Sequence, residues 1–291
     1  MSETAIARAK ALACFSDPQD ITPLGGGITN INLLVRDGDR RFVVRLGDDI
    51  PEHGVMRWNE LALSQAAEMA GVSPAVFHQE PGVLVLNFVE ARTFEEADVR
   101  DPANLNKIID LVARAHRELG GHLSSPILTF WPFQVNRTYV TRLKADRSAH
   151  SDLLPGLMDT LSDLEKAVGP VDLVVGHNDL LAANLLDDGE RLWLIDWEYG
   201  GFNSPLFDLA GLASNNGLCE AQENAMLEQY FEAPAETHWR AYQAMKCTSL
   251  MRETLWSMTS EIHSRLDFDY AAYTRENMDR LTAALSKFRE L

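Results

Sequence analysis

A polar loop near residue 180 carries side chains whose types and spacing suit phosphoryl transfer. Asp179 and Asn184 lie five residues apart in "HNDLLAANLL", and Asp196 ends the apolar run "LWLID" that follows. Phosphoryl transfer requires a base that orients a hydroxyl group, and oxygen ligands that hold Mg²⁺ against a nucleotide. We therefore expect Asp179 to be the base, and Asn184 and Asp196 to bind the metal.

These residues also have a purely structural interpretation. Asp and Asn are common at turns and caps, and a strand often ends at an Asp. For the loop alone the two interpretations are evenly matched, whereas Asp196 and the N-terminal features described below favour the catalytic one. We expect His177 to brace the loop by hydrogen bonding rather than to transfer protons.

A glycine-rich turn in the N-terminal region is the first candidate element for binding the phosphates of the nucleotide. Residues 21–46 alternate in a way that predicts three strands of an antiparallel sheet. Gly25, Gly26 and Gly27, followed by Asn30, lie between the first two strands, where backbone N–H groups can approach phosphate oxygens closely. A glycine turn alone is weak evidence.

Arg45 in the third strand and Glu60 in the following helix form the second candidate element. Kinases use such a strand cation, paired with a helix carboxylate, to hold the α- and β-phosphates. The alternative is a surface ion pair or two unrelated charges. The later strand "VLVLNFV" is expected to end as a hinge between two lobes, where the main chain of Asn87, Phe88 and Val89 can hydrogen-bond an adenine.

The remaining sequence predicts a mostly helical region around the polar loop. From about residue 101 apolar residues recur at helical spacing, and residues 172–197 are the exception, with short apolar runs around an Asp-Gly turn that predict a hairpin. We therefore expect an α+β fold of two lobes. Residues 1–90 would form a nucleotide-binding lobe with a small antiparallel sheet and one main helix, and residues 91–291 a larger catalytic and substrate-binding lobe.

Composition narrows the possible partners. The chain has 291 residues, 46% of them hydrophobic, and a formal net charge of −17, which repels nucleic acid and attracts cations.

No apolar run approaches the roughly 20 residues needed to cross a bilayer, and the N-terminus lacks a convincing signal peptide, so we expect a cytoplasmic location. The three cysteines, Cys14, Cys219 and Cys247, have no disulfide or metal-ligand spacing.

Over nearly its whole length the chain resembles the choline/ethanolamine kinase family of the aminoglycoside phosphotransferase-like superfamily. The resemblance is carried by "HNDLLAANLL", "LIDWEYGG", "NSPLFDLA" and "LWSMTSEIHSRLDFDYAAY". It implies a bilobed protein-kinase-like fold, ATP and Mg²⁺ as cofactors, and arginine at the position of Arg45. It further implies that Asp179 is the base, that Glu198 lies near the metals and that Asp208 holds the catalytic loop from below.

The resemblance also implies an aromatic site for a cationic amino alcohol, choline or ethanolamine. Tyr199, Trp256, Tyr270 and Tyr273 match positions where choline kinases place rings around a quaternary ammonium group, which cation–π attraction stabilises. Core packing is the alternative for each ring. Glu253 stands where choline kinases often have a second tryptophan, and its carboxylate could favour an amine with N–H donors.

Other functions remain open at this point. Leu181 stands where eukaryotic members often have a polar residue, so the identity of the alcohol is not fixed. The nearest alternative is a kinase of the same fold that acts on thiamine, an aminoglycoside, a sugar or an amino acid derivative. An alternative of a different class is a non-catalytic nucleotide-binding protein, although such a protein has no chemical need for the whole set of charged residues. No feature indicates an oligomeric state.

Overall fold

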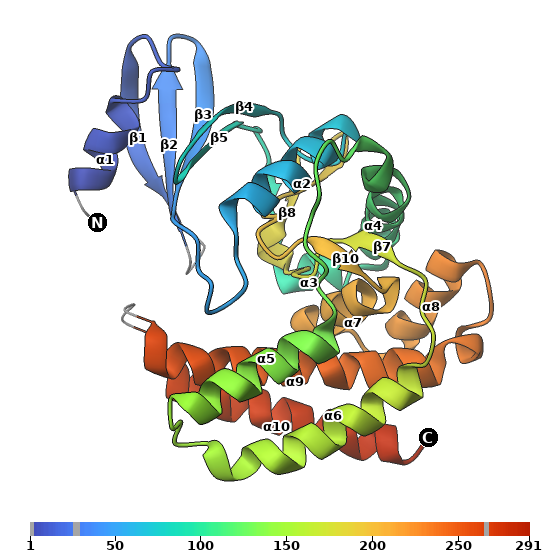
Figure 1. The fold of residues 1–291 in the computed structure, drawn as a ribbon. Helices are drawn as coiled ribbons and strands as arrows, with labels where there is room; N and C mark the ends of the chain where they lie inside the picture. Colours follow the sequence, from blue (N-terminus) through green and yellow to red (C-terminus); the bar gives the residue numbers. More distant parts are fainter. Residues whose placement is uncertain (1–2, 26–29, 265–267) are drawn as a thin grey trace.

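The computed structural model describes residues 3–25, 30–264 and 268–291. Its fold is α+β, with an antiparallel sheet in the N-terminal part and mostly helices in the rest (Figure 1). The sheet has the strand order β1-β2-β3-β5-β4 and contains β1 (Pro18–Leu24), β2 (Ile31–Asp37), β3 (Arg40–Leu46), β4 (Val76–Glu80) and β5 (Val83–Asn87). The predicted strands within residues 21–46 are therefore confirmed.

The two faces of this sheet have different partners. Helix α1 (Glu3–Lys10) covers one face, and the side chains on that face form an apolar cluster with it that includes Ala9, Leu33, Val35, Phe42 and Val44. Because side chains alternate along a strand, Arg45 lies on the opposite face. There it meets Glu60, which belongs to α2 (Arg57–Met69).

Helix α2 is packed mainly with the helical part of the molecule. Its buried Leu63, Ala66 and Ala67 belong to the same apolar cluster as the core of α4 (Pro102–His122). The helical part of the molecule therefore fixes the position of Glu60, whereas the sheet fixes that of Arg45. The boundary between lobes at residue 90 stays a prediction.

The C-terminal part is built around one central helix, α9 (Trp239–His263), which is buried along most of its length. Helices α5, α6, α7 and α10 pack around it, and Figure 1 shows α5, α6, α9 and α10 as a layer at the end of the molecule opposite the sheet. The other helices are α3 (Glu96–Val99), α5 (Pro132–Ala145), α6 (Leu154–Val168), α7 (Pro205–Asn216), α8 (Glu220–Phe231) and α10 (Tyr270–Arg289).

Short strands hold the polar loop within this helical part. One two-stranded sheet pairs β7 (Val174–Gly176) with β10 (Gly201–Asn203), and a second sheet has the order β6-β8-β9. The strands of the second sheet are β6 (Arg92–Thr93), β8 (Leu185–Asp187) and β9 (Leu192–Leu194). The polar loop therefore leaves the end of one small sheet and enters the other.

The predicted hairpin is formed by β8 and β9. Its turn contains Gly189 at a φ of +90°, and the Asp188 side chain accepts hydrogen bonds from the N–H groups of Glu190 and Arg191. The two strands pair antiparallel, and just beyond them the N–H of Ile195 donates to the carbonyl of Asn184 at 3.0 Å. This register places Asn184, the residue before β8, beside Ile195, the residue after β9.

Two further features bear on the expectations from composition. Among the helices of the described residues, none is long and apolar enough to cross a membrane. The three cysteines are free thiols, with Cys247 buried and Cys219 exposed.

Candidate active site

Arg45 is the centre of a buried network of charges between the sheet and the helical part. Its Nη1 lies 3.0 Å from Glu60 Oε1, and its Nη2 lies 2.6 Å from Asp196 Oδ1. Burial opposes the positive charge, but the carboxylates of Asp196, Glu60 and Glu198 outweigh it and raise the pKa of Arg45 above its ordinary value. The sequence-predicted partnership of Arg45 with Glu60 is thus a direct, buried ion pair.

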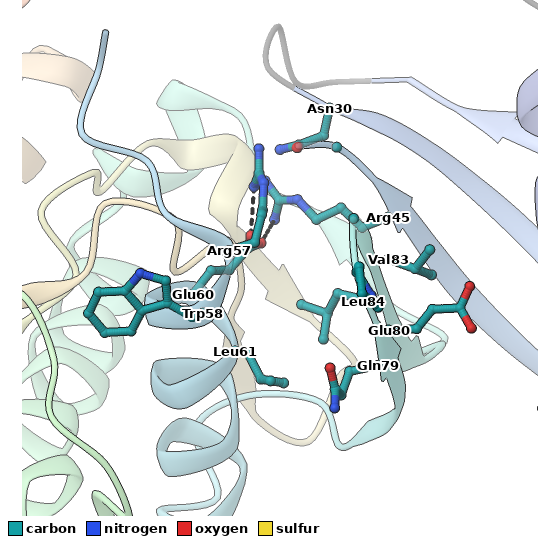
Figure 2. Close-up of a pocket in the computed structure, with 13 residues that line it drawn as sticks. Asn30, Arg45, Arg57, Trp58, Glu60, Leu61, Gln79, Glu80, Val83 and Leu84 are labelled. Atoms are coloured by element: carbon teal, nitrogen blue, oxygen red, sulfur yellow. Dashed lines mark hydrogen bonds and ion pairs between the residues drawn. The ribbon is translucent and has the colours of Figure 1, made fainter. Parts of the chain in front are cut away.

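A second arginine, which sequence reasoning missed, completes this network. Arg57 Nη1 lies 2.6 Å from Glu60 Oε2 and 3.3 Å from Glu198 Oε2. Figure 2 shows the side chains of Arg45 and Arg57 meeting at Glu60, with Asn30 beside them. The available signal was the spacing of Arg57 and Glu60, three residues apart on one helix face.

Glu198 joins this network rather than standing apart from it. Its Oε2 accepts from Asn30 Nδ2 at 2.9 Å and lies 3.2 Å from Arg45 Nη2. Arg45 Nη2 therefore lies within 3.2 Å of oxygens from both Glu198 and Asp196. Two carboxylates are brought side by side in this way, and a cation between them would gain from both charges.

The loop that carries Asp179 is held from below by Asp208. The Asp208 carboxylate accepts from the main-chain N–H of His177 at 2.7 Å and from that of Asn178 at 2.6 Å. The side chain of His116 on α4 lies 2.8 Å from the same carboxylate. Burial opposes the charge of Asp208, yet the hydrogen bond and charge of His116 and the neighbouring His177 lower its pKa. Such contacts are what a bracing role requires, and His116 is an addition that the sequence did not indicate.

His177 is buried within the loop itself. Its Nε2 lies 2.9 Å from the carbonyl oxygen of Ile195, and this contact joins the loop of Asp179 to the residue just before Asp196. Burial lowers the pKa of His177, and the charge of Asp208 works against this shift. Asn178 and Asp196 both have left-handed backbone angles, with φ of 67° and 71°, a strained conformation that tends to persist at functional sites.

Asp179 lies near charged side chains of the Arg45 network and of helix α9. Burial raises its pKa to about 8; Arg252 works against this shift, and Glu253, Asp196 and Glu198 add to it. A carboxylate poised near neutral pH is suited to general-base chemistry. The charges that act on Asp179 thus come from both sides of the loop.

The remaining predicted metal ligand, Asn184, lies directly beside Asp179. Asn184 Nδ2 donates to the main-chain oxygen of Asp179 at 2.9 Å, and among the described residues none donates to its Oδ1. No three His, Cys, Asp or Glu side chains gather as a metal site in the described part of the chain. Two carboxylates and an amide oxygen nevertheless fit Mg²⁺, which keeps water and nucleotide oxygens among its ligands.

A cavity of about 290 Å³ adjoins this network and is the candidate nucleotide site. Its lining contains Gly25, Arg45 and Asp196 together with apolar residues and the predicted hinge, namely Val43, Leu86, Asn87, Phe88, Val89, Leu186 and Ile195. Of the three N–H groups predicted to reach an adenine, those of Asn87 and Phe88 already donate to the carbonyls of Ala75 and Arg41. Gly26 and Gly27 lie outside the described residues.

The four aromatic residues predicted for the substrate side come together in one cluster. Trp256 Nε1 donates to the Tyr199 hydroxyl at 3.1 Å. The Trp256 ring centroid lies 6.0 Å from that of Tyr270 and 6.4 Å from that of Tyr273, the latter pair being nearly perpendicular. Tyr273 also donates its hydroxyl to Glu253 Oε1 at 2.8 Å.

Two cationic or titratable side chains in this cluster were not anticipated. Arg252 lies over the Tyr199 ring, with its Cζ 4.4 Å from the centroid. The His53 ring centroid lies 5.1 Å from that of Trp256, with the ring planes tilted by 34°, and burial lowers the pKa of His53 to about 3, so it is neutral. The only sequence signal for Arg252 was its spacing from Trp256, which lies four residues further along the same helix.

A small antiparallel sheet joined to a helical part, with a buried strand arginine paired to a helix glutamate and to the aspartate after a hairpin, defines a phosphotransferase of the protein-kinase-like class. Residues 20–245 match the phosphotransferase enzyme family, and the chain belongs to this family. The family resemblance and the bilobed α+β fold expected from the sequence are thereby confirmed.

Individual relatives agree with this assignment. The chain is 26% identical to Protein LicA of Haemophilus influenzae over 277 residues, which cover 91% of this chain and 79% of that protein. It is 24% identical to a probable ethanolamine kinase of Arabidopsis thaliana over 281 residues, 86% of this chain and 75% of the other.

Solved structures show the same fold. A choline/ethanolamine kinase family protein from Mesorhizobium loti superposes with a TM-score of 0.76 at 28% identity and covers 97% of this chain and 94% of its own. A spectinomycin phosphotransferase, at 14% identity and a TM-score of 0.63, covers 98% of both chains and shares the fold alone.

Proposed function

We propose that this chain is an ATP-dependent kinase that transfers the γ-phosphoryl group to the hydroxyl of a small amino alcohol, with choline and ethanolamine as the first candidates. The observation that carries the proposal is the position of Asp179. The charges of Asp196 and Glu198 act on its carboxyl group from the phosphate side. Those of Arg252 and Glu253 act on it from the aromatic side. A base between these two regions can contact the hydroxyl of an acceptor that is bound on the aromatic side and points toward the phosphates.

The residues of the chain divide the work of this reaction. Asp179 orients the acceptor hydroxyl and takes its proton, while the hydroxyl oxygen bonds to the γ-phosphorus and the bond to the bridging oxygen breaks, leaving ADP. Arg45 offsets charge on the phosphates, and Glu60 holds its guanidinium in place. Asn184 and Asp196, with Glu198 nearby, would hold Mg²⁺, which when bound offsets further charge on the nucleotide.

The partners follow from the same arrangement. The aromatic cluster around Trp256 supports an acceptor with an ammonium group, because ring faces attract cations. The similarity of this chain to a probable ethanolamine kinase and a probable choline kinase of Arabidopsis thaliana supports the same acceptor class. We place the reaction in the cytoplasm, without nucleic acid or membrane partners. Thiamine and aminoglycosides are the competing acceptors.

The test is an ADP-release assay with Mg²⁺ and ATP over choline, ethanolamine, methylated ethanolamines, thiamine and aminoglycosides. We expect one amino alcohol to stand out, and Asp179→Asn to lower its turnover by roughly 10²- to 10⁴-fold. Asp172→Asn, an exposed Asp just before β7, is the matched control and should keep full activity. Nucleotide binding without turnover of any alcohol would instead support the non-catalytic alternative.

A further inference from the structure

Arg252 is a buried cation on the acceptor side of the site. It lies on α9 and is 4% exposed. Its Nη1 lies 2.8 Å from Glu253 Oε2, and its guanidinium covers the Tyr199 ring and also lies 5.9 Å from the ring centroid of Phe130. The phosphate side already has its own arginines in Arg45 and Arg57.

Two nitrogens of this guanidinium are unpaired within the part of the chain that the structure describes. Among the described residues, none accepts a hydrogen bond from Nε or Nη2 of Arg252, although both atoms are buried. Buried N–H groups of a charged side chain are costly to leave unpaired. Nε and one Nη of an arginine form a fork that matches the two oxygens of a carboxylate. The unpaired atoms therefore point to a ligand that brings acidic oxygens.

The neighbouring carboxylate changes the charge balance of the site. Glu253 is already engaged twice, by Arg252 and by the hydroxyl of Tyr273. Its negative charge is thus matched by a resident cation, so Glu253 offers little net charge to an acceptor that carries only a positive one. Tyr199 in addition already offers its ring face to Arg252.

We propose that Arg252 selects amino alcohols that also carry a carboxylate, so that the preferred acceptor is a hydroxylated zwitterion, such as a hydroxy amino acid or a hydroxylated betaine. The inference rests on the proposed kinase function. In the bound state the acceptor carboxylate pairs with the unpaired nitrogens of Arg252. The acceptor ammonium lies toward Glu253 and the rings, and the hydroxyl reaches Asp179.

Matched acceptors that differ only in the carboxylate test this selection. Serine and ethanolamine form one such pair, and carnitine and β-methylcholine form the methylated pair. We expect kcat/KM to be roughly 10- to 100-fold higher for the member with the carboxylate in the preferred pair. Calorimetric binding of both members to the full chain, with a non-hydrolysable ATP analogue and Mg²⁺, should show the same order.

Substitutions at Arg252 then locate the origin of the preference. Arg252→Gln should remove most of this preference, because it should lower kcat/KM only for the acceptor that carries a carboxylate. Arg252→Lys, which keeps the charge but loses the fork, should retain a fraction. Lys246→Gln removes another partly buried cation of α9, which pairs with Glu223 far from the rings, and should leave the preference intact. If Arg252→Gln fails to fold, the double change Arg252→Gln with Glu253→Gln removes both charges together.

Several outcomes would overturn the inference while the proposed function stands. One is equal or better turnover of ethanolamine and β-methylcholine in the wild type. Another is a uniform loss of kcat on both members of each pair in Arg252→Gln, which would mean that Arg252 contacts the transferred phosphoryl group. If no alcohol is phosphorylated, the proposed function fails, and equal binding of both members would then reject the role of Arg252 separately.

Discussion

Replacement of Asp179 by Asn is expected to stabilise the ligand-free protein while it removes activity. Burial raises the pKa of Asp179 from 3.8 to about 8. Between these values the folded protein keeps a proton that the unfolded chain has released, so the wild type loses stability as pH rises from about 4 to about 8. Asn carries no titrating group, so the variant does not lose stability in this way as pH rises.

The size of the effect follows from the shift. About four pKa units correspond to about 6 kcal/mol at about 1.4 kcal/mol per unit. Asp179 is only partly buried, and solvent screening reduces this figure by about half, to roughly 3 kcal/mol. At about 2–4 °C per kcal/mol for a protein of this size, Asp179→Asn should raise Tm by about 6–12 °C at pH 9, but by only about 2 °C at pH 5.

Scanning calorimetry at pH 5, 7 and 9, without Mg²⁺ or nucleotide, measures this difference. Asp172→Asn serves again as the control, because an exposed Asp should give the same small change at every pH. A Tm difference for Asp179→Asn that did not grow between pH 5 and pH 9 would refute the reasoning. It would mean that Asp179 is ionised in the folded protein throughout this range, and that its burial does not perturb it.

Three other substitutions test the remaining parts of the site. Arg45→Met should raise the KM for ATP by tenfold or more with little change in the KM of the acceptor, and should destabilise the fold by about 3–5 kcal/mol in urea unfolding because Glu60 loses a buried partner. Asp208→Asn should cost roughly 2–3 kcal/mol in the same assay, since charge-assisted hydrogen bonds to two loop N–H groups are weakened. Trp256→Ala should weaken acceptor binding far more than ATP binding in calorimetric titrations, and equal losses would identify the ring as core.

The parts of the site that were predictable depend on local sequence. Asp188 and Gly189 favour a tight turn, and the short apolar runs beside them favour the two strands, so the pairing of Asn184 with Ile195, the residue before Asp196, follows from the hairpin alone. Alternation along β3 likewise put Arg45 on the face away from the apolar cluster. The aromatic cluster was predicted by family resemblance, not by any local pattern.

The parts that were missed depend on long-range packing. His116 reaches Asp208 across 92 positions of the chain, and no spacing rule connects two such residues. Arg252 lies on α9, which is surrounded by other helices and therefore has little contrast between a polar and an apolar face. Without such contrast, the sequence cannot indicate which residues of this helix face the acceptor.

The example of Glu253 shows why a single substitution within a family pattern is an unsafe guide to the substrate. Taken alone, a carboxylate in place of a tryptophan adds a negative charge to a cation site and favours an amine. In the folded protein the same carboxylate is bound by Arg252, the residue beside it, so the pair adds no net charge to the pocket. What the pair does add is a direction for hydrogen bonding, with carboxylate oxygens on Glu253 and, on Arg252, N–H groups that find no acceptor among the described residues. The departure from the family pattern therefore concerns the whole pair, and the acceptor that suits it carries charges of both signs.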